Sequence, residues 1–151
     1  MCQGATDFQR TNLATAQDQT RTGNQRTQVE RLMARAAHLP AGDRILLHQV
    51  YELGLKPADI AKAAQSDRQI IYRRIRALLR RLTDPLYLYV VAHFETLSPA
   101  VQPVAKAIVL HGHTQRQAAK LTGQTTHQVR SHLLALRALA QREARIGFNR
   151  H

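Results

Sequence analysis

The chain has 151 residues, with 22 lysines and arginines against 10 acidic residues, which gives a formal net charge of +12 and a pI near 11.2. A pI above about 9 indicates a polyanionic partner such as nucleic acid. The single cysteine, Cys2, excludes a fold held together by internal disulfides, and no apolar run reaches the roughly 18 residues that a transmembrane helix requires. The first residues also lack the pattern of a secretory signal, so we expect a cytoplasmic protein without membrane contacts.

The first 26 residues are rich in glutamine, threonine and asparagine and contain few apolar side chains. Such a segment buries too little surface to offset the entropy that it loses on ordering. We predict that residues 1–26 are a disordered arm, and we place no functional site there.

From Thr27 onward the sequence repeats itself with an offset of 58 residues, so that residues 27–84 align with residues 85–142. The paired positions keep their apolar character and include several identities: Leu39 with Leu97, Gly54 with Gly112, Ala61-Lys62 with Ala119-Lys120, and Ala77-Leu78 with Ala135-Leu136. We interpret the two segments as copies of one structural unit, followed by a basic tail over residues 143–151.

The sequence of the first unit predicts four helices. Apolar residues at spacings of three and four predict the first helix. The second follows Pro40 and stops at Gly54, because a glycine in a left-handed conformation ends a helix at little cost. A short third helix begins near Pro57. Asp67 is the predicted N-cap of a long fourth helix that runs to about Leu82.

The second unit repeats this plan. Asp84 and Pro85 form an N-cap followed by a proline at the first helical position. Pro103 delays the start of the second helix to about Gln102. The predicted helices are 85–96, 98–111, 115–121 and a long one after Thr125. The expected fold is therefore all-α, with two tandem four-helix units, each containing a helix-turn-helix, after the disordered arm.

Residues 59–75 and 117–133 have the spacing of a helix-turn-helix, which is a short helix, a tight turn and a second, capped helix. Ala61 is a small residue at the position where the two helices cross. Gly123 stands in the second turn, where a positive φ is favourable. Gln65 occupies the matching position of the first unit, which weakens that turn.

The first unit resembles region 4 of bacterial sigma-70-type factors through Leu39-Pro40, Gly54, Asp59-Ile60-Ala61 and the arginine-rich segment 74–82. In the second unit, residues 129–133 are similar to the recognition helix of response-regulator-type DNA-binding modules. The resemblance covers about residues 39–140 and implies binding to the major groove of promoter-like DNA. Nothing in the chain corresponds to the larger sigma domain that melts promoters, so we do not expect a complete sigma factor.

The long helix of the first unit carries six arginines and one aspartate between Asp67 and Leu82. Side chains near the start of a recognition helix contact base edges, whereas cations along its flank contact phosphates. The predicted base-reading residues are Arg68, Gln69, Tyr72 and Arg73, and the predicted phosphate contacts are Arg76, Arg80 and Arg81.

The corresponding residues of the second unit carry less charge. Its predicted DNA-binding residues are Thr126, His127, Gln128, Arg130 and Ser131, together with Lys120 on the preceding helix. This surface either reads a second segment of the major groove or mediates the formation of a homodimer. Both alternatives remain open from the sequence.

The sequence shows no pattern typical of an enzyme. His111 and His113 are the one close histidine pair, and neither a cysteine nor a carboxylate lies at ligand spacing from them. A glycine-rich phosphate loop and a nucleophile with a base partner are also missing. We therefore expect no catalytic activity, no cofactor and no metal.

The sequence predicts a sequence-specific double-stranded DNA-binding protein, a transcriptional regulator of a bacterium or a mobile element. One alternative is a protein-interaction module that acts on RNA polymerase or a sigma factor. Another is an adaptor in DNA packaging, replication or segregation, where the same motif locates a DNA site.

Overall fold

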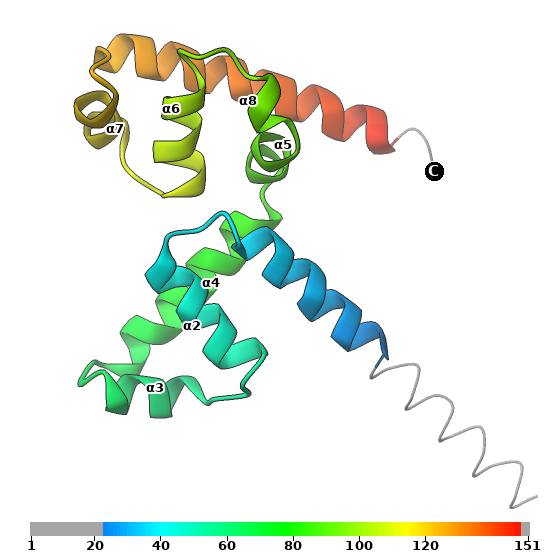
Figure 1. Ribbon diagram of the computed structural model, residues 1–151, viewed down its shortest axis with the longest axis vertical. Coiled ribbons are helices and arrows are strands. Elements are labelled where there is room, and N and C mark those ends of the chain that lie inside the picture. The colour runs from blue at the N-terminus through cyan, green and yellow to red at the C-terminus, as the bar shows by residue number, and fades with distance from the viewer. Residues whose placement is uncertain (1–22, 149–151) are drawn as a thin grey trace, which may run out of the picture.

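A computed structural model describes residues 23–148, and within that range the chain consists of helices and their connections, without strands (Figure 1). The predicted all-α class is confirmed. Most of the predicted arm, residues 1–22, and the last three residues of the predicted tail lie outside the described residues. Between residues 23 and 148, no helix combines the length and the apolar character needed to cross a bilayer.

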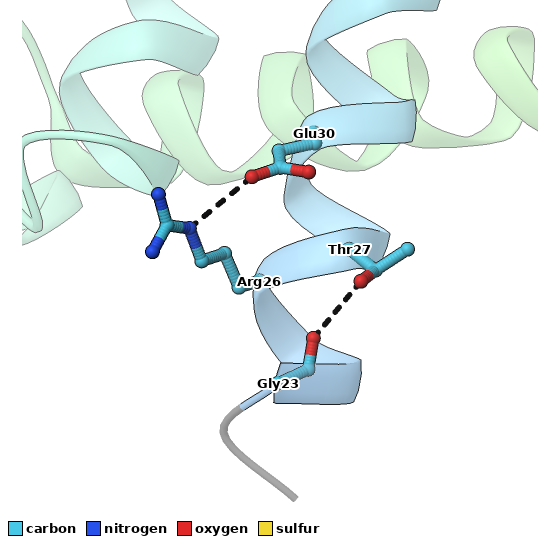
Figure 2. Close-up of polar contacts among 4 residues, drawn as sticks. All are labelled: Gly23, Arg26, Thr27 and Glu30. Atoms are coloured by element: carbon cyan, nitrogen blue, oxygen red, sulfur yellow. Dashed lines mark hydrogen bonds and ion pairs between the residues drawn. The ribbon is translucent and has the colours of Figure 1, made fainter. Parts of the chain in front are cut away.

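The first helix spans residues 23–36 and starts inside the predicted arm. Figure 2 shows two contacts at its start: Thr27 Oγ1 donates to the carbonyl of Gly23 at 3.0 Å, and Arg26 Nε donates to Glu30 Oε1 at 3.2 Å. Both join residues four positions apart, which are neighbours on a helix surface. The predicted arm is therefore wrong for residues 23–26, because these polar residues extend a helix that packs through apolar side chains further along.

Three helices complete the first half of the chain: α2 Ala41–Tyr51, α3 Pro57–Ala63 and α4 Arg68–Thr83. The predicted N-cap of α4 is confirmed, since the carboxylate of Asp67 accepts a hydrogen bond from the backbone N–H of Gln69 at 2.8 Å. The buried face of α4 consists of Ile71, Ile75, Leu78 and Leu82, which recur at spacings of three and four. The opposite face of this amphipathic helix is exposed.

The second half contains α5 Pro85–His93, a 3-10 turn Phe94–Thr96, α6 Gln102–Val104, a π-helical continuation Ala105–Leu110, α7 Gln115–Thr122 and α8 Thr126–Phe148. Asp84 caps α5 by accepting from the N–H of Leu86 at 2.8 Å, and the delayed start at Gln102 is confirmed. The first of the predicted helices, 85–96, ends earlier than expected at His93, where the chain tightens into the 3-10 turn. α8 continues six residues beyond the expected boundary at 142, so much of the predicted tail is helical.

The 58-residue offset is visible in the backbone. Gly54 and Gly112 have φ values of 66° and 74°. Gln65 and Gly123, at the starts of the connections to α4 and α8, have φ values of 51° and 68°. The turn after α2 and the turn after Leu110 contain equivalent hydrogen bonds, both 2.9 Å long. The N–H of Leu55 donates to the carbonyl of Gln49, and the N–H of His113 donates to the carbonyl of Ala107.

The buried side chains follow the same offset. The four buried residues of α4 correspond, 58 positions later, to buried residues of α8: Val129, Leu133, Leu136 and Ala140. Both long helices therefore present the same register of their apolar faces to the interior.

One apolar core spans both halves. It includes Leu47 and Leu82 from the first half and Tyr87, Val90 and Leu136 from the second, and all five are almost completely buried. A smaller cluster packs α6, α7 and α8 together through Val104, Ala107, Ala118 and Val129. Two similar chain segments thus meet between residues 84 and 85, and the apolar core continues across this boundary.

Tyr87 lies at the centre of this shared core. Its side chain is 1% exposed, and its hydroxyl donates to the backbone carbonyl of Arg35 at 2.7 Å. A buried hydroxyl is costly unless it is hydrogen-bonded, so this contact ties the end of the first helix to α5. Burial raises the pKa of Tyr87 to about 12, against a smaller opposing effect of the nearby Arg81 charge.

Arg81 makes a second link between the halves. Its guanidinium lies over Gly112, so close that a Cβ atom at this glycine would come within 2.7 Å of Arg81 Cζ. The Nη1 atom of Arg81 is buried and has no hydrogen-bond partner among residues 23–148. A glycine is therefore needed at position 112 for two reasons. It adopts a left-handed φ, and its lack of a Cβ atom leaves space for the guanidinium of Arg81.

Gly54 and Gly112, which are related by the 58-residue offset, allow the cost of the left-handed φ to be measured separately from the cost of displacing Arg81. We expect Gly54→Ala to lower the free energy of unfolding by about 1–2 kcal/mol, the cost of a left-handed L residue, because no other atom lies near the new Cβ. Gly112→Ala should cost about 1 kcal/mol more, because the packed guanidinium of Arg81 has to move. Urea unfolding of both variants measures the difference. Equal losses would show that Arg81 gives way freely.

Candidate nucleic-acid interface

The connection between α3 and α4 holds α4 in place. Ala61 is buried where the two helices pack, and its carbonyl accepts from the N–H of Ser66 at 2.9 Å. Gln65 adopts a left-handed φ in this connection, which is unfavourable for a residue with a Cβ atom. The tight turn is therefore formed although glutamine is less favourable than glycine at position 65. The packing of Ala61 supports this turn.

α4 brings six of the seven residues predicted on it to the surface. Arg68 lies at the first position of the helix, and the others recur at spacings of three and four, which places them along one face. These exposed residues are Arg68, Gln69, Tyr72, Arg73, Arg76 and Arg80.

The four arginines of this set, Arg68, Arg73, Arg76 and Arg80, form no ion pair within residues 23–148. The nearest acidic residue in sequence, Asp67, uses its carboxylate to cap the helix. The exposed face of α4 is therefore a row of cations without counter-charges from the described part of the chain. We call this set of six residues the α4 basic face.

Arg74 has a different role that the sequence did not suggest. Its Nη2 and Nε atoms donate to Asp43 Oδ1 at 2.6 and 2.9 Å, and the Asp43 side chain is only 16% exposed. Both hydrogen bonds are charge-assisted and converge on the same carboxylate oxygen. This pair fastens α4 to α2. No local pattern could have revealed a contact between residues 31 positions apart.

Arg81, which the sequence analysis groups with the phosphate contacts, lies apart from the α4 basic face. Its side chain is half-buried and packs over Gly112, as described above. It sits one helical position beyond Arg80, on the side that faces the second half. We therefore leave Arg81 out of the candidate interface.

The start of α8 exposes all of the residues predicted there. Thr126, His127, Arg130 and Ser131 are exposed, and so is Lys120 on α7. These side chains lie in the first two turns of α8 and beside them. They form no ion pair within the described part of the chain.

Gln128 is exposed but partly engaged. Its carboxamide oxygen accepts from the N–H of Thr125 at 3.0 Å, and its own N–H donates to Thr125 Oγ1 at 3.1 Å. This reciprocal pair is a capping box, and Thr114 with Gln117 forms another at the start of α7. The Thr-x-x-Gln pattern was the signal that the sequence analysis missed. The amide NH2 of Gln128 and the second lone pair of its oxygen are left for an outside partner.

Further along α8, the pattern of α4 is not repeated. The positions that correspond to Arg76, Arg80 and Arg81 hold Leu134, Ala138 and Leu139, and the two leucines are 58% and 44% exposed. Of the four exposed arginines of α8, only Arg130 lies in the first turns, and Arg137, Arg142 and Arg145 lie further along the helix.

His111 and His113 do not make a cation site with other residues. Their rings lie 6.3 Å apart, and the described residues contain no group of three or more histidine, cysteine or acidic side chains arranged to hold a metal ion. Burial, followed by the charges of Lys106, His113 and Arg81, lowers the pKa of His111 below its ordinary value of 6.5. These neighbours make the surroundings of His111 cationic and unfavourable for a further positive charge.

This pKa shift predicts a pH dependence of stability. In the unfolded chain His111 takes up a proton near pH 6.5, whereas in the folded chain it remains neutral to lower pH. The unfolded state then binds more protons as the pH falls below about 6.5, so the free energy of unfolding decreases there and levels off below the folded-state pKa. His111→Gln should remove this contribution. Urea unfolding of both proteins at pH 7.5, 6.5 and 5.5 tests it, and parallel curves would contradict the shift.

No protein-family model, curated protein or solved structure matches this chain. A function must therefore be inferred from the exposed residues themselves. The α4 basic face places four arginines without ion pairs within residues 23–148 on one exposed face of a single helix, and it is the surface that a function has to explain.

Proposed function

We propose that the protein is a sequence-specific double-stranded DNA-binding protein, acting as a transcriptional regulator in the cytoplasm of a bacterium or as part of a mobile element. α3 and α4 form its helix-turn-helix, and α4 is the recognition helix. The observation that carries this proposal is the α4 basic face, with four exposed arginines that lack counter-charges within residues 23–148. DNA phosphates supply the missing negative charge.

The geometry around α4 supports this role. A helix that enters the major groove has to be held rigidly, and α4 is held by the Asp67 cap, by packing of Ala61 and by the Arg74–Asp43 pair. These contacts leave the outer face of α4 free for a ligand. Rigid support of this kind lowers the entropy lost on binding.

The residues divide into two groups by their position on α4. Arg68, Gln69, Tyr72 and Arg73 lie in the first two turns, where side chains meet base edges. Arginine recognises guanine and glutamine recognises adenine, each through two hydrogen bonds. Arg76 and Arg80 lie further along the same face and suit the phosphates that flank the groove.

A second candidate function is a protein-interaction module that acts on RNA polymerase or a sigma factor. The exposed Leu134 and Leu139 favour it, because apolar side chains suit a protein surface better than a phosphate backbone. The α4 basic face favours DNA, because four unpaired arginines on one face suit the regular charge of a duplex.

Selection of bound sequences from a random double-stranded DNA pool at about physiological salt separates these candidates. Non-specific contacts are weak under this condition, so only specific sites are retained. We expect enrichment of a defined motif. A pool that stays random after repeated rounds would count against DNA recognition and favour the protein-interaction module.

Two single substitutions on α4 test the division of roles. Arg68→Ala should weaken binding to the selected site by about 1–3 kcal/mol and relax the preference for one base pair. Arg80→Ala should weaken binding to all duplexes about equally and reduce the slope of log affinity against log salt by about 0.9.

The matched control is Arg31→Ala, which removes an exposed arginine from the first helix without touching α4. It should leave both the base preference and the affinity nearly unchanged. Fluorescence anisotropy titrations at three salt concentrations measure all three variants. If Arg68→Ala and Arg80→Ala both behaved like the control, α4 would not be the DNA-binding helix.

A further inference from the structure

We infer that one chain contacts two major-groove segments of a single duplex at the same time, through the start of α4 and the start of α8, with a separation that the fold sets. This inference rests on the proposed function of α4 and adds a second contact to it. It defines the DNA ligand as a bipartite site that is bound by a monomer.

The start of α8 reproduces the local geometry of the start of α4. A left-handed residue, Gln65 or Gly123, begins each connection, and a side-chain oxygen, from Asp67 or Thr125, caps each helix. The buried residues then follow in the same register along both helices. Both helices thus expose the same positions of their first two turns.

The two helix starts also lie along one side of the molecule. In Figure 1, the connection before α4 and the connection before α8 are at opposite ends of the long axis and on the same long edge. From these points α4 and α8 both run back toward the other side. A straight duplex placed along that edge would meet both helix starts.

The link between α4 and α8 is stiff. Asp84 is the single residue between α4 and α5, and it caps α5. α5 in turn packs against α8 in the shared core, where Tyr87 and Leu136 are almost fully buried. The contact of Arg81 with Gly112 fixes the same junction from the other side. A core packed in this way does not change the spacing of the two helix starts without losing buried contacts.

The chemistry at the start of α8 suits DNA better than a second copy of the chain. Thr126, His127 and Ser131 offer exposed hydrogen-bonding groups, and Arg130 and Lys120 offer cations without ion-pair partners among residues 23–148. A symmetric dimer through this surface would bring like charges together, which is destabilising.

The test uses the full chain and the duplex obtained by selection. Hydroxyl-radical and guanine-methylation footprinting should show two protected segments on the same face of the duplex, with one chain per duplex by analytical ultracentrifugation. Arg68→Ala should weaken protection of one segment, and Arg130→Ala should remove protection of the other and lower affinity about 5-fold to 100-fold. The matched control, Arg145→Ala, removes an exposed arginine from the far part of α8 and should leave both segments protected.

A second duplex, with 10 base pairs inserted between the protected segments, keeps both on one face but moves them apart by about 34 Å. The stiff junction predicts that this duplex binds wild-type protein only as tightly as the original duplex binds Arg130→Ala. Unchanged affinity for the longer duplex, a single protected segment that survives Arg130→Ala, or two chains per duplex would each overturn the inference and leave the proposed function of α4 standing. Absence of any protected segment would overturn the proposed function itself.

Discussion

Burial of Tyr87 between the two halves of the chain is the constraint on which the rest of the structure depends. The aromatic ring belongs to the same buried core as Leu82 and Leu136, and its hydroxyl is satisfied by the carbonyl of Arg35. Because only Asp84 separates α4 from α5, the packing of this ring also constrains the direction in which α4 leaves the core. The position of the α4 basic face is thus a consequence of apolar packing on the opposite side of the same helix. A charged surface of this kind needs such support, since like charges in a row repel one another and do not stabilise a helix.

Local signals in the sequence were sufficient for most of the secondary structure. The caps at Asp67 and Asp84 and the delayed start at Gln102 each depend on one or two adjacent residues, and the structure contains all three. The extent of the outer helices was harder to predict. The first helix begins at residue 23 and α8 continues to Phe148, although Gly23, Asn24 and Gly147 are poor helix formers, because propensity alone sets no sharp helix boundary.

The sequence predicts which face of α4 is exposed, but it does not predict which arginines of α4 make tertiary contacts. Helical spacing alone places six residues on one exposed face of α4, whereas the positions of Arg74 and Arg81 depend on Asp43 and Gly112, which are 31 residues distant in either direction. Two arginines that look equivalent in sequence to their neighbours are therefore engaged in tertiary contacts, and one of them, Arg81, is removed from the predicted interface. Gln65 illustrates the opposite case, because an unfavourable backbone conformation is accepted where the surrounding packing supports it.

The single residue between α4 and α5 has a consequence for how the molecule loses its structure. The core shared across Asp84 joins the apolar interiors of both halves, so we expect the two halves to melt together as one cooperative unit. Anything that binds the folded form through one half then holds the other half folded as well, by mass action. A destabilising substitution has the same reach. A cavity in the core beside α8 lowers the fraction of chains that are folded, and it therefore also lowers the fraction in which the α4 basic face is formed.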